Sequence, residues 1–212
     1  MKHYHHEVHV RDWHGIIATR VARQARRFRD YASGIRAKRL AMFWGVEMGA
    51  GCSFHGPVHF RRDIGSSIVI GEHCVFRSTP WSNPVGINRP CMLIALRGSR
   101  IALGNHSGFS GTVISATMGV TIGDRVLCGA NVTITDNDWH QLDPEDRLGL
   151  GEAAPIVIED NVWLGLGVVV LKGVTIGHDS VVAAGSIVSD SIPPLSLAAG
   201  CPARVIREIG RT

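Results

Sequence analysis

The residue best suited to chemistry is a histidine in the polar stretch TDNDWHQLDPEDR, which covers residues 135–147. This histidine, His140, follows a tryptophan and lies between Asp138 and Asp143. An imidazole with an ordinary pKa of about 6.5 suits proton abstraction near neutral pH, and rigid scaffolds often present such groups on loops. No serine or cysteine nucleophile motif, Walker loop or dinucleotide fingerprint accompanies it. The stretch therefore favours general-base catalysis by His140, with an inert exposed histidine as the alternative.

The polar stretch interrupts a sequence that repeats every six residues. A period of six fits neither a long helix nor an alternating hairpin strand. It predicts short strands joined by turns and stacked into coils, with one aliphatic side chain per strand facing inward and a smaller one beside it. The aliphatic column is Ile158, Leu164, Val170, Ile176, Val182 and Val188, and its companions are Val162, Val168, Val174, Ser180 and Ser186.

The same period occurs earlier in two other registers. Each change of register marks an insertion, and the two clearest insertions cover residues 77–92 and 135–155. We therefore expect a β-helix over residues 45–190 that carries two inserted loops. The earlier registers are Val46, Cys52, Val58, Ile64, Ile70 and Phe76, followed by Ile122, Cys128 and Ile134.

The segment 1–44 is basic, with ten Lys and Arg against three Asp and Glu. Its apolar residues approximate a helical stripe. Such a helix either caps the open end of the coil stack or lies on an anionic lipid surface. Residues 191–212 are expected to form a C-terminal extension with a short helix. The N-terminal stripe is Ile17, Val21, Ala25, Phe28, Ala32 and Ile35.

Composition argues against several other classes of protein. The 212 residues contain no apolar run of about 18 and no signal-peptide pattern, so we expect a cytoplasmic protein, with membrane association only through the basic helix. The five cysteines form no C-x-x-C pair, and the histidines at positions 3, 5, 6, 9 and 14 lack partner ligands. Neither a disulfide framework nor a metal site is therefore expected. Nucleic acid is not an expected partner, because the basic charge is confined to one terminal segment.

Two stretches carry a family resemblance, IGDRVLCGANVTITDNDWHQLDPEDR (122–147) and PIVIEDNVWLGLGVVVLKGVTIGHDSVVAAGSIVSDSIPPLSLAAGCPARVIREI (155–209). They resemble the left-handed β-helix acyltransferases, particularly the sugar and polysaccharide O-acetyltransferases related to the maltose, galactoside and nodulation-factor enzymes. The close resemblance covers residues 94–209, and looser repeats extend it to residue 46. It implies an all-β left-handed parallel β-helix, acetyl-CoA as acyl donor, a sugar or glycan acceptor, and a homotrimer without a metal.

The resemblance also implies roles for individual residues. His140 would take the proton from an acceptor hydroxyl, which attacks the acetyl-CoA thioester directly. Either Asp138 or Asp143 would orient the imidazole. The alternative is solvated loop charge for these two acids, pure coil packing for the tryptophan and the small residues of the donor groove, and a solvated helix face for the two arginines. The implied donor residues are Trp163, Gly165, Ala184 and Gly185 beside the acyl arm, and Arg204 and Arg207 at the CoA phosphates. The implied acceptor residues are Asn131 and Asp138. The alternative for Asn131 is that it only shapes a turn.

Departures from the family pattern keep the acceptor open. Ser189, Asp190 and Ser191 replace the family's T-K-D, so a CoA-binding lysine is absent, and Phe109 or Ser110 occupies the place of the galactoside enzymes' sugar-contacting asparagine. These differences favour polysaccharide or lipid-linked glycan acceptors. N-acetylation of an amino sugar or nucleotide-amino sugar is the alternative. A more distant alternative is a β-helix protein that is not an acyltransferase. It would be either a non-catalytic protein or a carbonic-anhydrase-like metal protein that uses His55, His59, His73 and His106.

Overall fold

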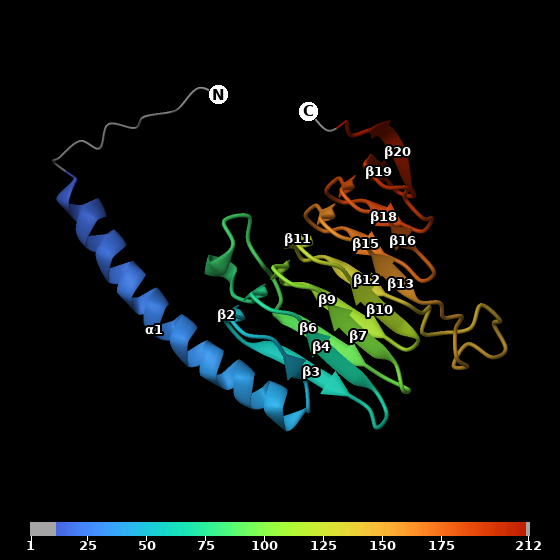
Figure 1. The fold of residues 1–212 in the computed structure, drawn as a ribbon, viewed down its shortest axis with the longest axis horizontal. Coiled ribbons are helices and arrows are strands. Elements are labelled where there is room, and N and C mark those ends of the chain that lie inside the picture. The colour runs from blue at the N-terminus through green and yellow to red at the C-terminus, as the bar shows by residue number, and fades with distance from the viewer. Residues whose placement is uncertain (1–11, 211–212) are drawn as a thin grey trace.

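The fold is a three-sided stack of parallel coils, with one long helix at its N-terminal end (Figure 1). The computed structural model describes residues 12–210, so the histidines at positions 3, 5, 6 and 9 lie outside the described residues. Successive strands fall on different sides, and each strand pairs with the one three positions later, up to the last coil. This pairing defines three sheets, which we name A, B and C in the order in which the chain visits them.

The strands are short, as the period of six predicts. Sheet A contains β1 (Glu47–Met48), β4 (Ser67–Ile70), β7 (Arg100–Leu103), β10 (Gly119–Ile122), β13 (Ile156–Ile158) and β16 (Thr175–Ile176). Sheet B contains β2 (Ser53–His55), β5 (Val75–Arg77), β8 (Gly108–Ser110), β11 (Leu127–Ala130), β14 (Trp163–Leu164), β17 (Val181–Val182), β19 (Ser196–Gly200) and β20 (Ala203–Glu208). Sheet C contains β3 (Val58–Arg62), β6 (Cys91–Ala95), β9 (Val113–Ala116), β12 (Thr133–Thr135), β15 (Val169–Val170) and β18 (Ile187–Val188).

The predicted aliphatic column forms the core of the C-terminal coils. All six of its residues and all five companions are buried, and Leu164, Val170 and Val182 have no exposed surface. The N-terminal coils are filled differently, by a ladder of phenylalanines on sheet B. Phe54 stacks on Phe76 and Phe76 on Phe109, with ring centroids 5.2 and 5.1 Å apart. The inward position of the period therefore accepts either an aliphatic or an aromatic column.

The expected column is wrong at one position of the N-terminal coils. Ile64 is fully exposed, whereas Val58, Ile70 and Phe76 of the same register are buried. The strand before it, β3, runs on to Arg62, and the chain then turns through Ile64 and Gly65 before β4 begins. Gly65 adopts a φ of 81°, which suits a tight corner. Ile64 lies in that corner and points outward.

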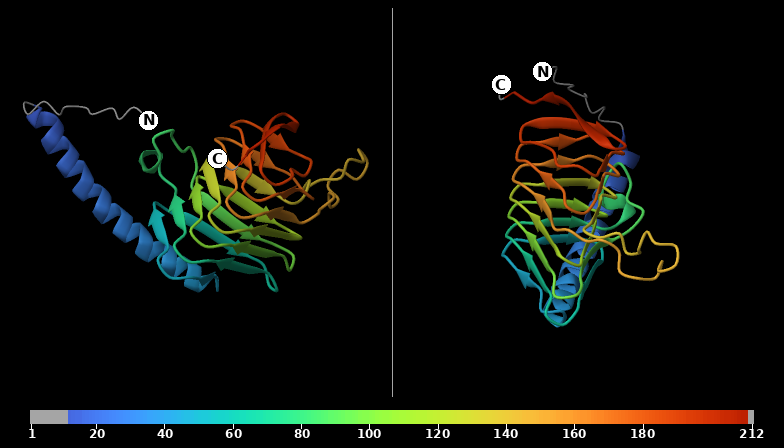
Figure 2. Two further views of the ribbon diagram at one scale, coloured as in Figure 1. Left: turned by 45° about the horizontal axis from the view of Figure 1, so that its top comes forward. Right: turned by 90° about the vertical axis from the view of Figure 1, so that its right-hand side faces the viewer.

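The N-terminal helix α1 (Trp13–Phe43) lies against the end of the coil stack through its second half, from Asp30 onward. It begins at Asp12, whose side chain accepts a hydrogen bond from the Gly15 N–H at 2.8 Å. Among its side chains only Ala37 and Ala41 are buried, and α1 contacts β1, β2 and β3. The earlier turns project away from the coils, as Figures 1 and 2 show. No helix within residues 12–210 combines the length and apolar character needed to cross a membrane.

The C-terminal extension contains a strand where a short helix was expected. The chain reverses through Cys201 and Pro202, and β20 pairs antiparallel with β19. Two physical features explain the difference. The outer edge of β19 needs hydrogen-bond partners, and the adjacent β-branched residues Val205 and Ile206 favour a strand over a helix.

Candidate active site

The polar loop of residues 136–155 leaves the prism where sheet C turns into sheet A, and it protrudes from the coils (Figure 2). A buried carboxylate, Asp136, fixes its root. The Asp136 oxygens accept hydrogen bonds from the backbone N–H groups of Thr117, Met118 and Gly119, at 2.7–3.0 Å. The Thr117 hydroxyl and the Asn137 amide donate as well. Sequence reasoning missed Asp136, because nothing distinguishes it from the other acids of the loop before the fold is known.

A second set of contacts closes the base of the loop. Asn137 forms an antiparallel bridge with Ala153, and the Asp138 N–H donates to the Glu152 carbonyl at 3.0 Å. The ammonium group of Lys172, on the next coil, contacts the Asp138 carboxylate, and this hydrogen bond raises the pKa of Lys172. Asp138 is therefore engaged at the base of the loop. Lys172 is a further residue that sequence reasoning did not identify, since only the stacking of coils brings it near the loop.

His140 lies exposed just beyond this base. Its Nδ1 atom is 3.0 Å from the Arg147 carbonyl oxygen. Because a carbonyl oxygen only accepts, a neutral imidazole must carry its proton on Nδ1, which leaves Nε2 free to accept one. A backbone carbonyl therefore sets the tautomer that a general base requires. Neither Asp138 nor Asp143 forms a hydrogen bond with the imidazole among the described residues; Asp143 instead accepts from the Glu145 N–H at 2.9 Å.

The residue before His140 has an uncommon backbone conformation. Trp139 has a φ of 63°, in the left-handed region that bulky residues rarely occupy. Most other non-glycine residues with positive φ lie at the corners of the coils, whereas Trp139 lies in the loop. The Asn137 side chain accepts from its N–H at 2.9 Å, and the His140 N–H donates to the Asp138 carbonyl at 2.7 Å. These bonds hold a tight turn, which fixes the backbone from which the His140 side chain projects.

The predicted donor residue Trp163 lies on the outer face of sheet B. The strand register places Leu127, Trp163, Val181, Leu197 and Arg207 in one row. Trp163 is 53% exposed. Neighbouring strands lie about 4.8 Å apart, so three strand steps separate Trp163 from Arg207 by roughly 14 Å. The row offers an extended apolar surface with a cation at its far end, which suits a long acyl carrier that ends in phosphates.

The two predicted donor-groove glycines, Gly165 and Gly185, are required by the fold for different reasons. A Cβ on Gly165 would lie 2.6 Å from the Ala184 backbone nitrogen, so this glycine is required for coil packing. Gly185 has a φ of 74°, and a Cβ there would meet nothing within 4 Å. Gly165 and Ala184 therefore lie against each other, one coil apart, and Gly185 forms an open corner between sheets B and C.

The two predicted phosphate ligands are not equivalent. The Arg204 Nη1 atom lies 2.7 Å from the Asp190 carboxylate, and both side chains are exposed. Asp190 occupies the centre of the segment that departs from the family's T-K-D, so this departure adds an acid that pairs with Arg204. Arg207 forms no ion pair within residues 12–210. It is the freer of the two for a phosphate.

Asn131, a predicted acceptor residue, lies at the corner between sheets B and C with a φ of 62°. Its side-chain oxygen accepts from the Asn88 N–H at 3.2 Å, and its carbonyl accepts from Arg89 at 2.7 Å. Both donors belong to the first insertion, which contains the short turn η1 (Pro80–Ser82). Asn131 therefore joins that insertion to the coils, and Arg89 is another residue that the sequence did not single out.

The structure does not bring the two halves of the candidate site together in one chain. His140 lies at the corner between sheets C and A, whereas Trp163 belongs to sheet B and Gly185 to the corner between sheets B and C. Sheet C separates these positions. No group of three or more potential metal ligands occurs within residues 12–210.

The repeated three-sided coil of short strands places this fold in the class of hexapeptide-repeat β-helix proteins. The family described as the hexapeptide repeat of succinyl-transferase matches residues 110–136 and 155–190. A solved galactoside acetyltransferase in complex with coenzyme A is 30% identical, with 84% of this chain and 82% of that chain covered and a TM-score of 0.54. The chain therefore belongs to the hexapeptide-repeat acetyltransferases, and its fold is the left-handed parallel β-helix.

Two curated relatives are galactoside O-acetyltransferases. The one from Escherichia coli (strain K12) is 47% identical over 116 residues, which cover 53% of this chain and 56% of the relative. The one from Lactococcus lactis subsp. lactis (strain IL1403) is 37% identical over 141 residues, which cover 66% of this chain and 62% of the relative. The chain thus spans little more than half the length of these curated relatives.

Proposed function

We propose that the protein transfers an acetyl group from acetyl-CoA to a hydroxyl group of a sugar or glycan, with His140 as the general base. The observation that carries this proposal is the hydrogen bond between His140 Nδ1 and the Arg147 carbonyl, which leaves Nε2 able to accept a proton. Family membership supports the acyl chemistry, and the names of the galactoside O-acetyltransferase relatives support a sugar hydroxyl as acceptor.

The reaction needs only one proton carrier. Nε2 of His140 takes the proton from the acceptor hydroxyl as its oxygen attacks the thioester carbonyl carbon of acetyl-CoA. The tetrahedral intermediate then collapses, the carbon–sulfur bond breaks, and the imidazolium returns the proton to the departing CoA sulfur. The products are the acetyl ester and CoA with a free thiol. Trp163 and the outer row of sheet B hold the acyl arm, and Arg207 meets the phosphates as a charge-assisted donor.

The active site is completed by a neighbouring chain in a homotrimer. Within one chain His140 and Trp163 are separated by the width of sheet C, so the loop of one protomer must serve the donor row of another. Three leucines near the loop tip, Leu142, Leu148 and Leu150, are exposed and give the loop an apolar surface for such a contact. Most soluble oligomers are closed and symmetric, and three such interfaces close a ring.

The base is tested by comparing His140→Ala with His14→Ala, a control on the exposed first turn of α1. Release of CoA thiol is measured with hydroxyl and amine acceptors at saturating acetyl-CoA. His140→Ala is expected to lower kcat by about 10²- to 10⁴-fold without weakening acetyl-CoA binding, and His14→Ala to change neither. Near-normal turnover of the His140 variant would show that the loop is structural. Faster release with an amine acceptor would favour N-acetylation, the alternative function.

The shared site is tested by mixing His140→Ala with Trp163→Ala after dissociation and reassembly, at an acetyl-CoA concentration at which neither variant alone turns over. If each site combines the loop of one chain with the donor row of another, about a quarter of the interfaces in random trimers regain both native residues. Activity should therefore return on mixing. No recovery, together with light scattering that reports a monomer, would contradict the trimer.

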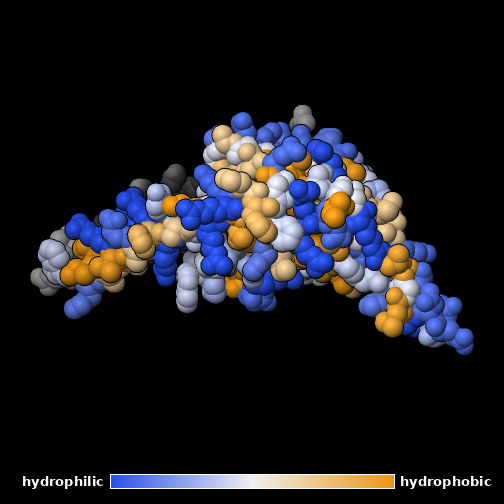
Figure 3. All heavy atoms as spheres, turned by 90° about the horizontal axis from the view of Figure 1, so that it is seen from below, coloured by the Kyte–Doolittle hydropathy of each residue, from blue (hydrophilic) through white to orange (hydrophobic). Residues whose placement is uncertain are grey.

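The projecting part of α1 supports a further partner for this enzyme. Its exposed residues include Trp13, Ile17 and Val21, and Figure 3 shows apolar surface along it. The helix carries eight Lys and Arg against the single acid Asp30. We propose that it lies on an anionic lipid surface, as basic amphipathic helices do. Sedimentation with anionic vesicles but not with neutral ones is expected, and Ile17→Asp should prevent it.

A further inference from the structure

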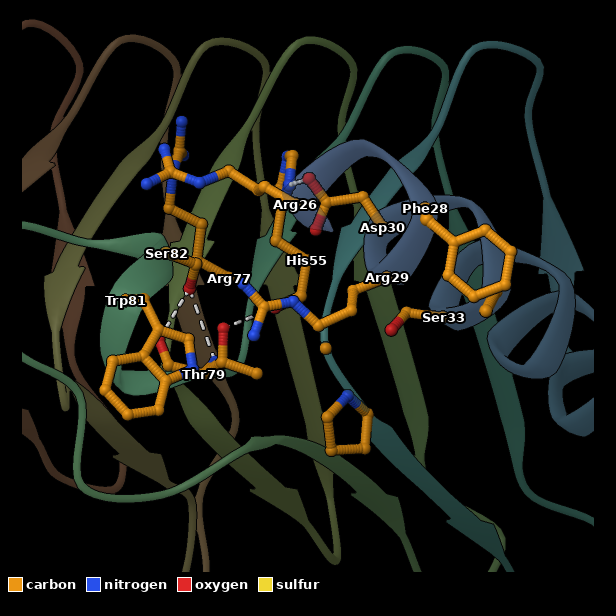
Figure 4. A pocket seen from close by; sticks show the side chains of 13 residues that line it. Arg26, Phe28, Arg29, Asp30, Ser33, His55, Arg77, Thr79, Trp81 and Ser82 are labelled. Carbon is orange, nitrogen blue, oxygen red and sulfur yellow. Dashed lines mark hydrogen bonds and ion pairs between the residues drawn. The ribbon is translucent and has the colours of Figure 1, made fainter. Parts of the chain in front are cut away.

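A pocket lies between α1 and the N-terminal coils, away from His140 (Figure 4). Its volume is about 420 Å³, within the range of small-molecule sites. One wall is the face of α1 that carries Arg26, Arg29 and Asp30. The opposite wall is the corner at which sheet B turns into sheet C, with Arg77 and the η1 residue Trp81. Figure 4 shows the side chains of the two walls facing one another.

The pocket has a surplus of positive charge. Three guanidinium groups line it, those of Arg26, Arg29 and Arg77, and none of them forms an ion pair within residues 12–210. Among the described residues of the lining, the one acid, Asp30, is engaged by His55, with 3.0 Å between the carboxylate oxygen and Nδ1. Guanidinium groups match the geometry of carboxylate and phosphate oxygens. The pocket therefore suits an anion.

The wall opposite α1 is held in place. The Ser82 hydroxyl donates to the Thr79 carbonyl at 2.7 Å, and the Thr79 hydroxyl donates to the His55 carbonyl at 3.4 Å. Gly56 has a φ of 111°, and a Cβ there would lie 2.5 Å from the Thr79 side chain, so the close approach of this turn requires glycine. These contacts present the Trp81 ring, which is 68% exposed, beside the three arginines. A flat ring of this kind can pack against the C–H face of a sugar.

The same insertion connects the pocket to the corner between sheets B and C, where the predicted residues Asn131 and Gly185 lie. From η1 the chain continues to Asn88 and Arg89, which bind Asn131. Asn131 and Gly185 both lie at the corner between sheets B and C, and Gly56 lies at the same corner nearer α1. A ligand longer than one sugar could therefore run along this corner from the pocket toward the donor groove.

We infer that this pocket binds an anionic saccharide, with a sugar carboxylate or a phosphate on Arg29 and Arg77 and the sugar ring on Trp81. The role of this pocket as a subsite for the acceptor rests on the proposed transfer reaction. The binding of an anionic saccharide does not depend on that reaction. It narrows the acceptor from any glycan to a glycan or glycan precursor that carries a negative charge.

Calorimetry without acyl donor tests the binding with three probes, namely sialyllactose, which carries a carboxylate, UDP-glucose, which carries a diphosphate, and neutral lactose. At least one anionic probe should bind at least about tenfold more tightly than lactose at physiological salt. Arg29→Gln and Arg77→Gln should each remove that advantage, and Trp81→Ala should weaken all sugar binding. Arg23→Gln, on α1 but outside the pocket lining, should stay within about twofold of the native protein.

Each outcome decides the inference. A preference for sialyllactose identifies a carboxylate ligand, and a preference for UDP-glucose identifies a phosphate. Equal affinity for lactose, or an equal loss in the Arg23→Gln control, overturns the pocket as an anion site. His140→Ala should retain anion binding. If that variant binds the anionic probe and also keeps full turnover, the proposed base fails while the pocket stands.

Discussion

The two insertions of the β-helix are attached in different ways. The first insertion is fastened along the coils by Arg89, which donates to the Gly111, Asn131 and Val132 carbonyls and to the Thr133 hydroxyl at 2.7–3.0 Å. Among the described residues, the second is attached at its base, through Asp136, through the contacts of Lys172 with Asp138 and Glu152, and through the hydrogen bond from the Gly173 N–H to the Ala154 carbonyl at 3.0 Å. Between residues 141 and 150, its hydrogen bonds in the described structure are internal to the loop.

This difference suits two different tasks. An insertion that is hydrogen-bonded to the coils at both ends, through Thr79 and through Asn88 and Arg89, can form part of the wall of the prism and shape a binding surface. A loop fastened at its base keeps a defined starting direction and leaves its tip available to another chain. The first arrangement fits the anionic-saccharide pocket, and the second fits the delivery of a base into a neighbouring active site.

The largest effect is expected from the tip of the second loop. Replacing residues 141–150 with a short Gly-Ser linker removes the Arg147 carbonyl that sets the His140 tautomer. It also removes the three exposed leucines proposed to contact another chain, so we expect kcat to fall about 10²-fold or more. The free energy of unfolding of the coils should change little, because residues 141–150 form no hydrogen bond with the coils in the described structure. Thiol release and urea unfolding measure the two quantities. A large loss of stability would show that the tip supports the coils and would remove the contrast between the loops.

Asp136→Ala should mainly affect the base of the same loop. It leaves the N–H groups of Thr117, Met118 and Gly119 without their acceptor, and Thr117 is buried, so the free energy of unfolding should fall by about 3 kcal/mol or more. Urea unfolding checks this value, with Asp143→Ala as the control, because Asp143 is exposed and its contacts stay within the loop. Equal stability of the two variants would mean that Asp136 does not anchor the loop.

Arg89→Ala tests the fastening of the first insertion. Four hydrogen bonds are lost, and burial already lowers the pKa of this arginine. We expect the free energy of unfolding to fall by about 1–3 kcal/mol. Affinity for the anionic saccharide should fall too, whereas kcat on a neutral acceptor should change less than in the loop-tip variant. Unfolding and calorimetry measure these effects, and unchanged affinity would separate the insertion from the pocket.

The smallest effect concerns Lys172. Its pKa is raised in the folded state by the hydrogen bond to Asp138, so its contribution to stability is complete below the unfolded pKa and is lost as the pH rises through the higher folded pKa. The chain has three lysines, which makes a carbon-13 NMR titration of the lysine side chains simple to assign. The Lys172 midpoint should lie above the other two, and Asp138→Asn should remove the difference. Coincident midpoints in the native protein would contradict the contact.

The repeat was readable from the sequence because each coil imposes the same requirement on one position. The column from Ile158 to Val188 is buried throughout, since short coils leave no alternative place for its side chains. The same reasoning is wrong at Ile64, where β3 continues past its expected length and the column position becomes a corner. A six-residue repeat in the sequence describes regular coils, but it does not show where a strand extends beyond the length typical of those coils.

The candidate site was readable only in part, for a different reason. His140 stands out because a polar histidine loop interrupts an apolar repeat. Asp136, Arg89 and Lys172 are invisible in the sequence because their partners are 17 to 44 residues away and become neighbours only through coil stacking. The C-terminal strand was missed for a related cause, since the open edge of β19 that it fills exists only once the coils are stacked.

The two ends of the stack also determine how far the structure can extend. Parallel coils have no inherent last member, because the edge of each coil is a template for the next, including one from another molecule. Here β20 turns antiparallel at one end of sheet B, and the close-packed alanines Ala37 and Ala41 bring α1 over the other end. Neither end resembles the coil that would continue it. Growth by parallel stacking of another molecule's coils is thereby disfavoured at these two places.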